Sequence, residues 1–278
     1  MNIKISIVIV SYNQDQFLEA TIQSVINQNY KNKEVILIDG GSTDNSLQII
    51  KKYAENFSNW VSEPDKGQTD AIIKGFNKST GDVISWINSD DLLESGVLDI
   101  VASKANNVNS VNGVFYGKSL VIDALGKKRD ISVHEKFNYF VSKKIGPCIS
   151  QPGTFWGREA YFAIGGLNID FNYCMDKDLF CNFLFSGYPF FYTGEVHASF
   201  RRYSTQKGHS LVFLKICDNE RMLIDKKYGY DDVSNFLKVI TRSIQVLSRI
   251  MNGYYFKTLI FRFQERKSFS QFKADYSN

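Results

Sequence analysis

The first hundred residues alternate between short apolar runs and segments with helical periodicity. The first run, KISIVIVSY at residues 4–12, is rich in β-branched residues, which is typical of a strand buried on both faces. Three similar runs follow, at residues 34–39, 60–63 and 82–87. The segment after the first run carries Leu18, Ile22 and Val25, the stripe of an amphipathic helix. Strands that alternate with helices predict right-handed crossovers and a mainly parallel sheet.

The alternation loosens in the second part of the chain. Residues 96–106 predict a helix and residues 113–123 a strand, whereas residues 134–166 mix loop, strand and helix. From about residue 211 the pattern is helical, through residues 214–229 and 233–251. We therefore predict an α/β fold with a C-terminal helical region.

Polar residues follow the predicted strands of the first part. They are Ser11 and Tyr12, Asp39, residues 63–65, and the pair Asp90 and Asp91. Parallel strands place their carboxyl ends at one edge of a sheet, where ligands of such sheets bind. We expect these side chains to line one crevice.

Composition narrows the choice of partners. The 278 residues carry a net charge of +4, which does not indicate a nucleic-acid partner. The four cysteines show no CxxC pattern, so we expect buried thiols in a reducing, cytosolic compartment. The apolar N-terminus runs directly into a polar turn and predicts a strand, not a signal peptide. No apolar run reaches the roughly 18 residues of a membrane span.

The C-terminal segment YYFKTLIFRFQERKSF, residues 254–269, interleaves aromatic and basic residues. This pattern is typical of a segment that lies on an anionic membrane surface. The alternative is a helix packed on the rest of the chain with a solvated basic face.

The adjacent carboxylates of Asp90 and Asp91 need a cation or hydrogen-bond donors nearby. A Mg²⁺ or Mn²⁺ ion takes few protein carboxylates and completes its shell with phosphate oxygens. One carboxylate would then hold the metal while its neighbour accepts a hydrogen bond from a ribose hydroxyl. In the alternative, one aspartate caps the following helix and the other is solvated.

Two turns add further candidates. In LIDGGSTDNS, Asp39 would accept an imide N–H from a pyrimidine base, and the following helix start favours negative charge. In SEPDKGQTDAI, Lys66 and Gly67 form a turn whose lysine would face a phosphate. Taken alone, each segment is equally typical of an ordinary turn between a strand and a helix.

Together and in this order, these segments resemble the family 2 glycosyltransferases of the GT-A fold. The resemblance is carried by SIVIVSYNQDQFLEATIQSVINQNY, EVILIDGGSTDNS, EPDKGQTDAI, GDVISWINSDD, SQPGTFWGREAYFAIGGLN and MDKDLF, within residues 5–203. It implies a GT-A domain over residues 1–210. The helical pattern and the basic, aromatic tail predict a helical, membrane-associating region over residues 211–278. Within the domain, about residues 1–95 would bind the nucleotide sugar and about residues 96–210 the acceptor.

The resemblance also implies roles for individual residues. Ser11 and Tyr12 would flank the base, Asp39 would read it, and Asp90 would face the ribose. Asp91 would be the metal ligand, for Mg²⁺ or Mn²⁺. On the acceptor side, the catalytic base would be Asp176, with Asp178 as the competing candidate. Gln151, Phe155 and Trp156 would lie against the acceptor, the two aromatic rings either stacking on a sugar or belonging to the core.

Four positions depart from the family pattern. Gly40 stands where the base-reading turn usually carries a second acid, so the reading of the base depends on Asp39 alone. Asn88 stands where the metal motif commonly has an acid, so the metal depends more on Asp91. Met175 replaces the acid that often precedes the base. Tyr203 replaces a common histidine, so Arg201 or Arg202 would supply positive charge to the diphosphate.

The implied activity is inverting, metal-dependent transfer of a hexosyl or N-acetylhexosaminyl group. The donor would be a UDP-sugar, and the acceptor a glycan or lipid-linked oligosaccharide. Such an enzyme would build a surface polysaccharide, such as an O-antigen or capsule, in the cytoplasm or peripherally on the inner face of the cell membrane. Two other classes were weighed. A sugar-1-phosphate nucleotidyltransferase needs a glycine-rich loop after the first strand, where SYNQDQF has none. A binding module that has lost catalysis stays open.

Overall fold

A computed structural model of the chain describes residues 1–132, 136–203, 211–251, 253, 256 and 258–259. Its strands are β1 Ile5–Ser11, β2 Lys33–Asp39, β3 Asn59–Ser62, β4 Val83–Asn88, β5 Leu92–Leu93, β6 Val114–Ile122, β7 Lys128–Ser132, β8 Phe155–Gly157 and β9 Phe190–Arg201. Its helices are α1 Asp15–Ile26, α2 Ser46–Lys52, α3 Gln68–Lys78, α4 Val97–Asn107, α5 Tyr139–Ile145, α6 Arg158–Ala163, α7 Met175–Phe185, α8 Leu211–Lys227 and α9 Asn235–Met251, with a 3₁₀ turn at Ala54–Asn56.

The strands form one mixed sheet in the order β3-β2-β1-β4-β8-β6-β9-β5, with β7 paired to β6. The first four strands in that order are parallel. β8 is antiparallel to both β4 and β6, and it joins the two parts of the sheet. β6 and β9 are again parallel to each other. This is the GT-A architecture that the sequence predicts, and the four predicted strands of the first part are confirmed.

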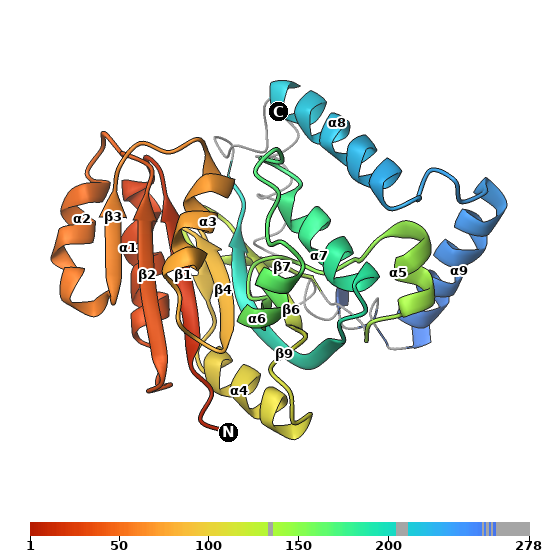
Figure 1. Cartoon of the computed structure of the whole chain (residues 1–278), viewed down its shortest axis with the longest axis horizontal. Coiled ribbons are helices and arrows are strands. Elements are labelled where there is room, and N and C mark those ends of the chain that lie inside the picture. The colour runs from red at the N-terminus through yellow and green to blue at the C-terminus, as the bar shows by residue number, and fades with distance from the viewer. Residues whose placement is uncertain (133–135, 204–210, 252, 254–255, 257, 260–278) are drawn as a thin grey trace.

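Helices cover both faces of the sheet, which explains why the central strands β1, β2 and β4 are largely apolar (Figure 1). Every residue of β1 is buried. Val8 and Val10 pack with Ile72 and Phe76 of α3 on one face. Ile7 and Ile9 pack with the apolar stripe of α1 on the other. Because strand side chains alternate between faces, a strand buried on both sides is apolar at most of its positions.

The thiols follow the prediction only in part. Cys174, Cys181 and Cys217 are buried free thiols, as expected, but Cys148 is exposed.

A buried histidine fixes the loop that precedes β8. His197 of β9 is 1% exposed. Its Nδ1 lies 2.6 Å from the carbonyl oxygen of Gly153, and its Nε2 lies 2.7 Å from the hydroxyl of Thr193. A carbonyl only accepts hydrogen bonds, so Nδ1 carries the proton of a neutral ring. Burial lowers the pKa of His197 from 6.5 to about 4.

This pKa predicts acid sensitivity. The native state binds fewer protons at His197 than the unfolded state, so its stabilisation is complete above the unfolded pKa of 6.5 and is lost as the pH falls toward about 4. Between about pH 7.5 and about pH 5, we expect His197 to remove about 2 kcal/mol of unfolding free energy. Urea denaturation at several pH values measures this slope. His197→Gln should unfold more easily at neutral pH but with a flatter slope, and an unchanged slope would contradict the prediction.

Candidate active site

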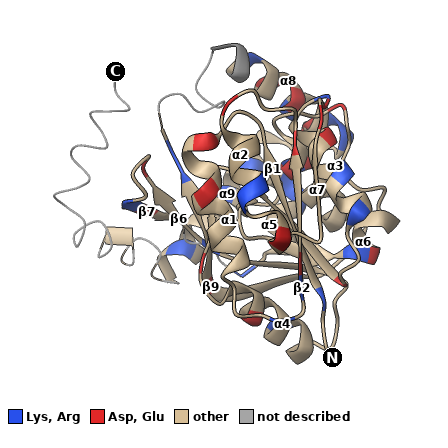
Figure 2. Cartoon of the chain, turned by 90° about the vertical axis from the view of Figure 1, so that its left-hand side faces the viewer, with Lys and Arg blue, Asp and Glu red and all other residues tan. Residues whose placement is uncertain are grey.

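The carboxyl ends of β1 to β4 meet at one edge of the sheet. Backbone hydrogen bonds join them: Gly40 N donates to Ser11 O at 2.9 Å, and Glu63 N to Asp39 O at 3.0 Å. In addition, Ser89 N donates to Val10 O at 3.1 Å. Charged segments of both signs lie along this edge, near α3, α7 and α8 (Figure 2). The predicted convergence of these strand ends is therefore present.

At the end of β1, the neighbouring side chains of Ser11 and Tyr12 differ in their exposure to solvent. Tyr12 is 61% exposed, so its ring is available to a planar ligand. Ser11 is buried, and its hydroxyl has no hydrogen-bond partner among the described residues.

Asp39 is engaged within the protein. Its side chain is fully buried. Its carboxylate accepts hydrogen bonds from the backbone N–H groups of Gly41 and Ser42 and from the hydroxyls of Ser42 and Ser62. It fixes the turn after β2 and joins it to β3. The structure therefore does not support the expected direct contact between Asp39 and a base.

The turn before α3 presents an exposed lysine and a special glycine. Lys66 is exposed, as expected for a phosphate-facing side chain. Gly67 has a φ of +114°, and a Cβ there would lie 2.9 Å from Oδ1 of Asn172. The glycine thus allows the start of α3 to approach the segment that precedes α7.

The two aspartates after β4 have different environments. Asp91 is completely buried, and its carboxylate accepts from Arg201 N at 2.9 Å and from Asn88 Nδ2 at 3.4 Å. Burial, and then the negative charge of Asp90, raises the pKa of Asp91 well above its usual value. Asp90 is 9% exposed, and its Oδ2 accepts from the hydroxyl of Tyr203 at 3.1 Å.

The metal role of Asp91 stays a prediction, and the structure adds Asp90 as a competing ligand. Both oxygens of Asp91 accept hydrogen bonds from protein donors in this structure. Asn88, which stands in place of a common acid, supplies one of those donors and is itself held by Gln68 Nε2 at 2.6 Å. Asp90 is the carboxylate of the pair that retains access to solvent.

Arg201 is a structural residue, so of the two arginines expected near a diphosphate the structure favours Arg202. The Arg201 side chain is buried and its guanidinium donates to the carbonyl oxygens of Asp90, Asp123 and Ala124. The same group lies over the ring of Phe17, 4.6 Å from the centroid. Its neighbour Arg202 is exposed.

The aromatic residues expected at the acceptor belong to the core. Phe155 and Trp156 are both 0% exposed, because β8 lies in the middle of the sheet with helices on both faces. Trp156 packs against Trp86, with a centroid distance of 5.3 Å. Gln151 is buried as well and donates to Trp86 O at 2.9 Å. The stacking of Phe155 or Trp156 on a sugar is therefore ruled out in this structure.

The start of α7 separates the two candidates for a catalytic base. Asp178 is 2% exposed and pairs with Lys227 of α8 through both oxygens, at 2.8 and 3.1 Å. Asp176 is partly buried and has no ion pair among the described residues. Burial raises the pKa of Asp176 above its usual value. The charge of Asp178 is thus balanced by Lys227, whereas Asp176 has no such partner among the described residues and is the more basic carboxylate.

Hydrogen bonds connect α7 to the carboxyl edge through α3. Gln68, at the start of α3, bonds to Asn88, and the next residue, Thr69, donates to Phe171 O at 2.5 Å. The segment around Phe171 leads directly into α7. The segment that precedes α7 and the end of β4 therefore both contact the start of α3.

Glu220 of α8 is a contributor that the sequence does not reveal. This buried carboxylate accepts from the backbone N–H groups of Asn172, Tyr173 and Cys174, at 2.8 to 2.9 Å. It fixes the segment before Asp176 from a position more than forty residues away in the sequence, so no local pattern could identify it.

The donor groups at this edge fit a metal that arrives with its substrate. Among the described residues there is no group of three or more His, Cys, Asp or Glu side chains that could hold an ion. Magnesium and manganese commonly use one or two protein carboxylates together with phosphate oxygens and water. Asp90, which is 9% exposed, fits that chemistry.

Comparison with known proteins identifies the class. Residues 6–163 match the family Glycosyl transferase family 2, which is more than half of the chain. The protein belongs to this family of glycosyltransferases.

Individual relatives share parts of the chain. A cholesterol galactosyltransferase of Borreliella burgdorferi is 35% identical over 128 residues, covering 45% of this chain and 36% of its own. An uncharacterized glycosyltransferase of Mycobacterium tuberculosis is 27% identical over 63% of this chain and 66% of its own. These alignments thus span from about a third to just under two thirds of the relatives' lengths. A Campylobacter jejuni GalNAc(5)-diNAcBac-PP-undecaprenol beta-1,3-glucosyltransferase is 26% identical over 81% of this chain and 78% of its own.

Solved structures agree in fold. Residues 1–349 of S. aureus TarS, in complex with UDP-GlcNAc, match with a TM-score of 0.64 and 14% identity, over 95% of this chain and 77% of that one. The mannosyltransferase PcManGT of Pyrobaculum calidifontis, with GDP-Man and Mn²⁺, matches with a TM-score of 0.55 and 16% identity, over 74% of this chain and 59% of that one. Both are GT-A glycosyltransferases.

Proposed function

We propose that the protein transfers a hexosyl or N-acetylhexosaminyl group from a UDP-sugar to a hydroxyl of a glycan or lipid-linked acceptor, with inversion at the anomeric carbon. The observation that carries this proposal is that two carboxylates, Asp90 and Asp176, lie on the segments that adjoin the start of α3. Asp90 remains accessible beside buried Asp91, and Asp176 remains unpaired beside neutralised Asp178. Family membership and the UDP-sugar complex of a structural neighbour support the same reading.

On the donor side, Asp90 would hold a Mg²⁺ or Mn²⁺ ion that arrives with the diphosphate. When bound, such an ion would neutralise the charge that develops on the leaving group. A Mn²⁺-containing neighbour of this fold supports the choice of ion. Exposed Lys66 and Arg202 would add positive charge, and the exposed ring of Tyr12 would lie against the base.

On the acceptor side, Asp176 would take the proton of the attacking hydroxyl. General base catalysis of this kind typically contributes about 10²–10⁴-fold to a rate. The raised pKa of Asp176 brings its basicity closer to that needed at neutral pH. The carboxylate must be ionised to accept the proton, so transfer should decline as the pH falls through that raised pKa.

The acceptor class is proposed from the relatives. The printed name of the Campylobacter relative describes a glucosyl transfer to an undecaprenol-linked oligosaccharide. A lipid-linked precursor of a surface polysaccharide, such as an O-antigen or capsule, is the corresponding acceptor here. The basic and aromatic segment at residues 254–269 lies almost entirely outside the described residues, so its membrane contact stays a prediction.

Substitution of the two neighbouring aspartates tests the donor side. Asp90→Asn should lower the affinity for UDP-sugar in Mg²⁺ or Mn²⁺ about tenfold or more, because the ion loses its protein carboxylate. With EDTA the variant and the wild type should bind alike. Asp91→Asn is the matched control and should keep its metal-dependent affinity. Titration calorimetry measures the affinity of both variants for UDP-sugar. If Asp91→Asn loses its metal-dependent affinity while Asp90→Asn keeps it, Asp91 is the metal ligand.

Substitution in α7 tests the acceptor side. Asp176→Asn should bind UDP-sugar normally but release UDP in the presence of acceptor at least about 10²-fold more slowly, since the base is lost. The control, Asp178→Asn, removes an ion pair from the same helix and should retain turnover in whatever fraction stays folded. Assays of UDP release measure both variants. Near-normal turnover by Asp176→Asn would refute its role, and no UDP-sugar binding by the wild type would refute the function.

A further inference from the structure

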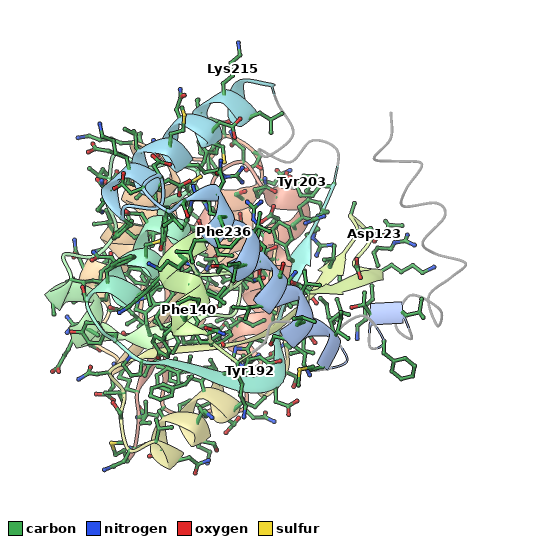
Figure 3. All side chains as sticks on the ribbon, turned by 90° about the vertical axis from the view of Figure 1, so that its right-hand side faces the viewer. Asp123, Phe140, Tyr192, Tyr203, Lys215 and Phe236 are labelled. Carbon is green, nitrogen blue, oxygen red and sulfur yellow. The ribbon has the colours of Figure 1, made fainter. Side chains whose placement is uncertain are left out.

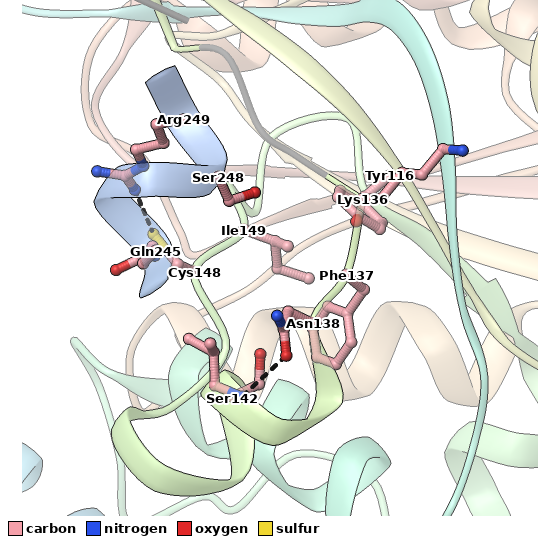
Figure 4. Close-up of a pocket in the computed structure, with 11 residues that line it drawn as sticks. Tyr116, Lys136, Phe137, Asn138, Ser142, Cys148, Ile149, Gln245, Ser248 and Arg249 are labelled. Atoms are coloured by element: carbon pink, nitrogen blue, oxygen red, sulfur yellow. Dashed lines mark hydrogen bonds between the residues drawn. The ribbon is translucent and has the colours of Figure 1, made fainter. Parts of the chain in front are cut away.

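Helix α9 packs with its polar side toward the protein. Its contacts are made with α5, and Thr241 near its middle is fully buried. Gln245, Ser248 and Arg249 line a pocket together with residues of α5 and its flanking loops (Figure 4). Arg249 Nη2 lies 3.7 Å from Sγ of Cys148 there.

The apolar side of the same helix faces solvent. We call it the outer face of α9; its apolar members are Phe236, Val239, Ile240, Ile244, Val246, Leu247, Ile250 and Met251, each between 36% and 87% exposed. Figure 3 shows α9 on the outside of the molecule, with Phe236 near the start of the helix. An ordinary surface helix buries its apolar stripe and exposes its polar side. A contiguous exposed apolar face of this size marks an interaction site.

The charges on α9 favour an anionic partner. The helix carries Lys238, Arg242 and Arg249 and no acidic residue. On a helical projection Lys238 and Arg242 fall along one flank of the outer face, whereas Arg249 lines the pocket on the inward side. Neighbouring α5 adds exposed Phe140 and Lys143.

We propose that the outer face of α9 lies on an anionic lipid surface. Its apolar side chains would enter the boundary between head groups and acyl chains, and the flanking cations would contact the negatively charged head groups. None of the helices in the described part of the chain is long and apolar enough to cross a membrane, which fits a helix lying in the surface plane. A second protein copy would need acidic residues opposite these cations, and α9 itself offers none.

Vesicle sedimentation of the full chain tests this proposal. Wild type should sediment with vesicles of phosphatidylcholine containing about a third phosphatidylglycerol, and more weakly with phosphatidylcholine alone or at high salt. The variant Phe236→Gln/Leu247→Gln/Ile250→Gln should bind about tenfold or more weakly. These side chains are exposed, so circular dichroism should show an unchanged fold.

Two controls make the result specific. Leu125→Gln/Ile169→Gln/Met222→Gln removes three exposed apolar side chains elsewhere and should bind like wild type. Arg242→Glu leaves the outer face intact and should weaken binding to the anionic vesicles alone. Equal sedimentation of wild type and the α9 triple variant would overturn the proposal. So would a wild-type dimer that the triple variant converts to a monomer, because a second copy would then cover the face.

A separate observation concerns the choice of nucleotide. A Cβ on Gly40 would lie 2.5 Å from Oδ2 of Asp65, so this carboxylate occupies the space of a side chain at position 40. The φ of Gly40 lies outside the left-handed region, so the glycine is required by space and not by backbone conformation. Asp65 is partly buried, and its Oδ1 accepts from Gly67 N at 2.8 Å.

We infer that Asp65 selects the base of the donor, an inference that rests on the nucleotide-sugar function proposed above. Asp39, beside it, is saturated by four protein donors, whereas Oδ2 of Asp65 receives no hydrogen bond from the described residues. A carboxylate only accepts hydrogen bonds. It therefore suits the imide N–H of uracil or thymine and disfavours cytosine, whose corresponding nitrogen is an acceptor.

Exchange of the two side chains tests this role. Asp65→Asn should lower UDP affinity about tenfold or more while CDP affinity holds or rises, because an amide can both donate and accept. Gly40→Asp/Asp65→Gly moves the carboxylate to the other position and should restore the preference for UDP. If wild type binds UDP and Asp65→Asn keeps the same ratio of UDP to CDP affinity, the role of Asp65 is refuted. If wild type binds no nucleotide diphosphate, the proposed function itself fails.

Discussion

The burial of Asp91 is the constraint on which the site depends. A carboxyl group without solvent must be met by protein donors or become neutral. Here the donors are the backbone of Arg201 and the side chain of Asn88. The Arg201 guanidinium in turn holds three carbonyl groups, from residue 90 and from the turn between β6 and β7. These bonds lock the end of β4 to β9, and Asp90 is the less buried member of the pair.

Much of the fold could be predicted from the sequence because its signals are local. Continuous β-branched runs, helical stripes and turn residues determine β1 to β4 and the helices between them, and parallel topology then brings the strand ends together. The convergence of Tyr12 and Asp90 at one edge follows from this alone. The helical nature of residues 211–251 was visible in the same way.

Side-chain direction could not be predicted in the same way. Phe155, Trp156 and Gln151 lie beside a loop in the sequence, but the short strand β8 is enclosed by β4 and β6, so both of its faces are core. Arg201 has the charge of a phosphate ligand, yet its surroundings are carbonyl oxygens. Asp39 was expected to face a base, and its turn folds back to saturate it. In each case the residue type was informative, while the environment depended on contacts distant in sequence.

The hydrogen bonds between Glu220 and the segment before α7 affect the order in which parts of the chain can fold during synthesis. All strands of the parallel half, and the aspartates after β4, leave the ribosome before α8 has been synthesised. The backbone amides of Asn172 to Cys174 remain without their carboxylate partner until residue 220 emerges. The nucleotide side of the molecule can therefore form early in synthesis, whereas the start of α7 acquires its final geometry only after residue 220 has been synthesised.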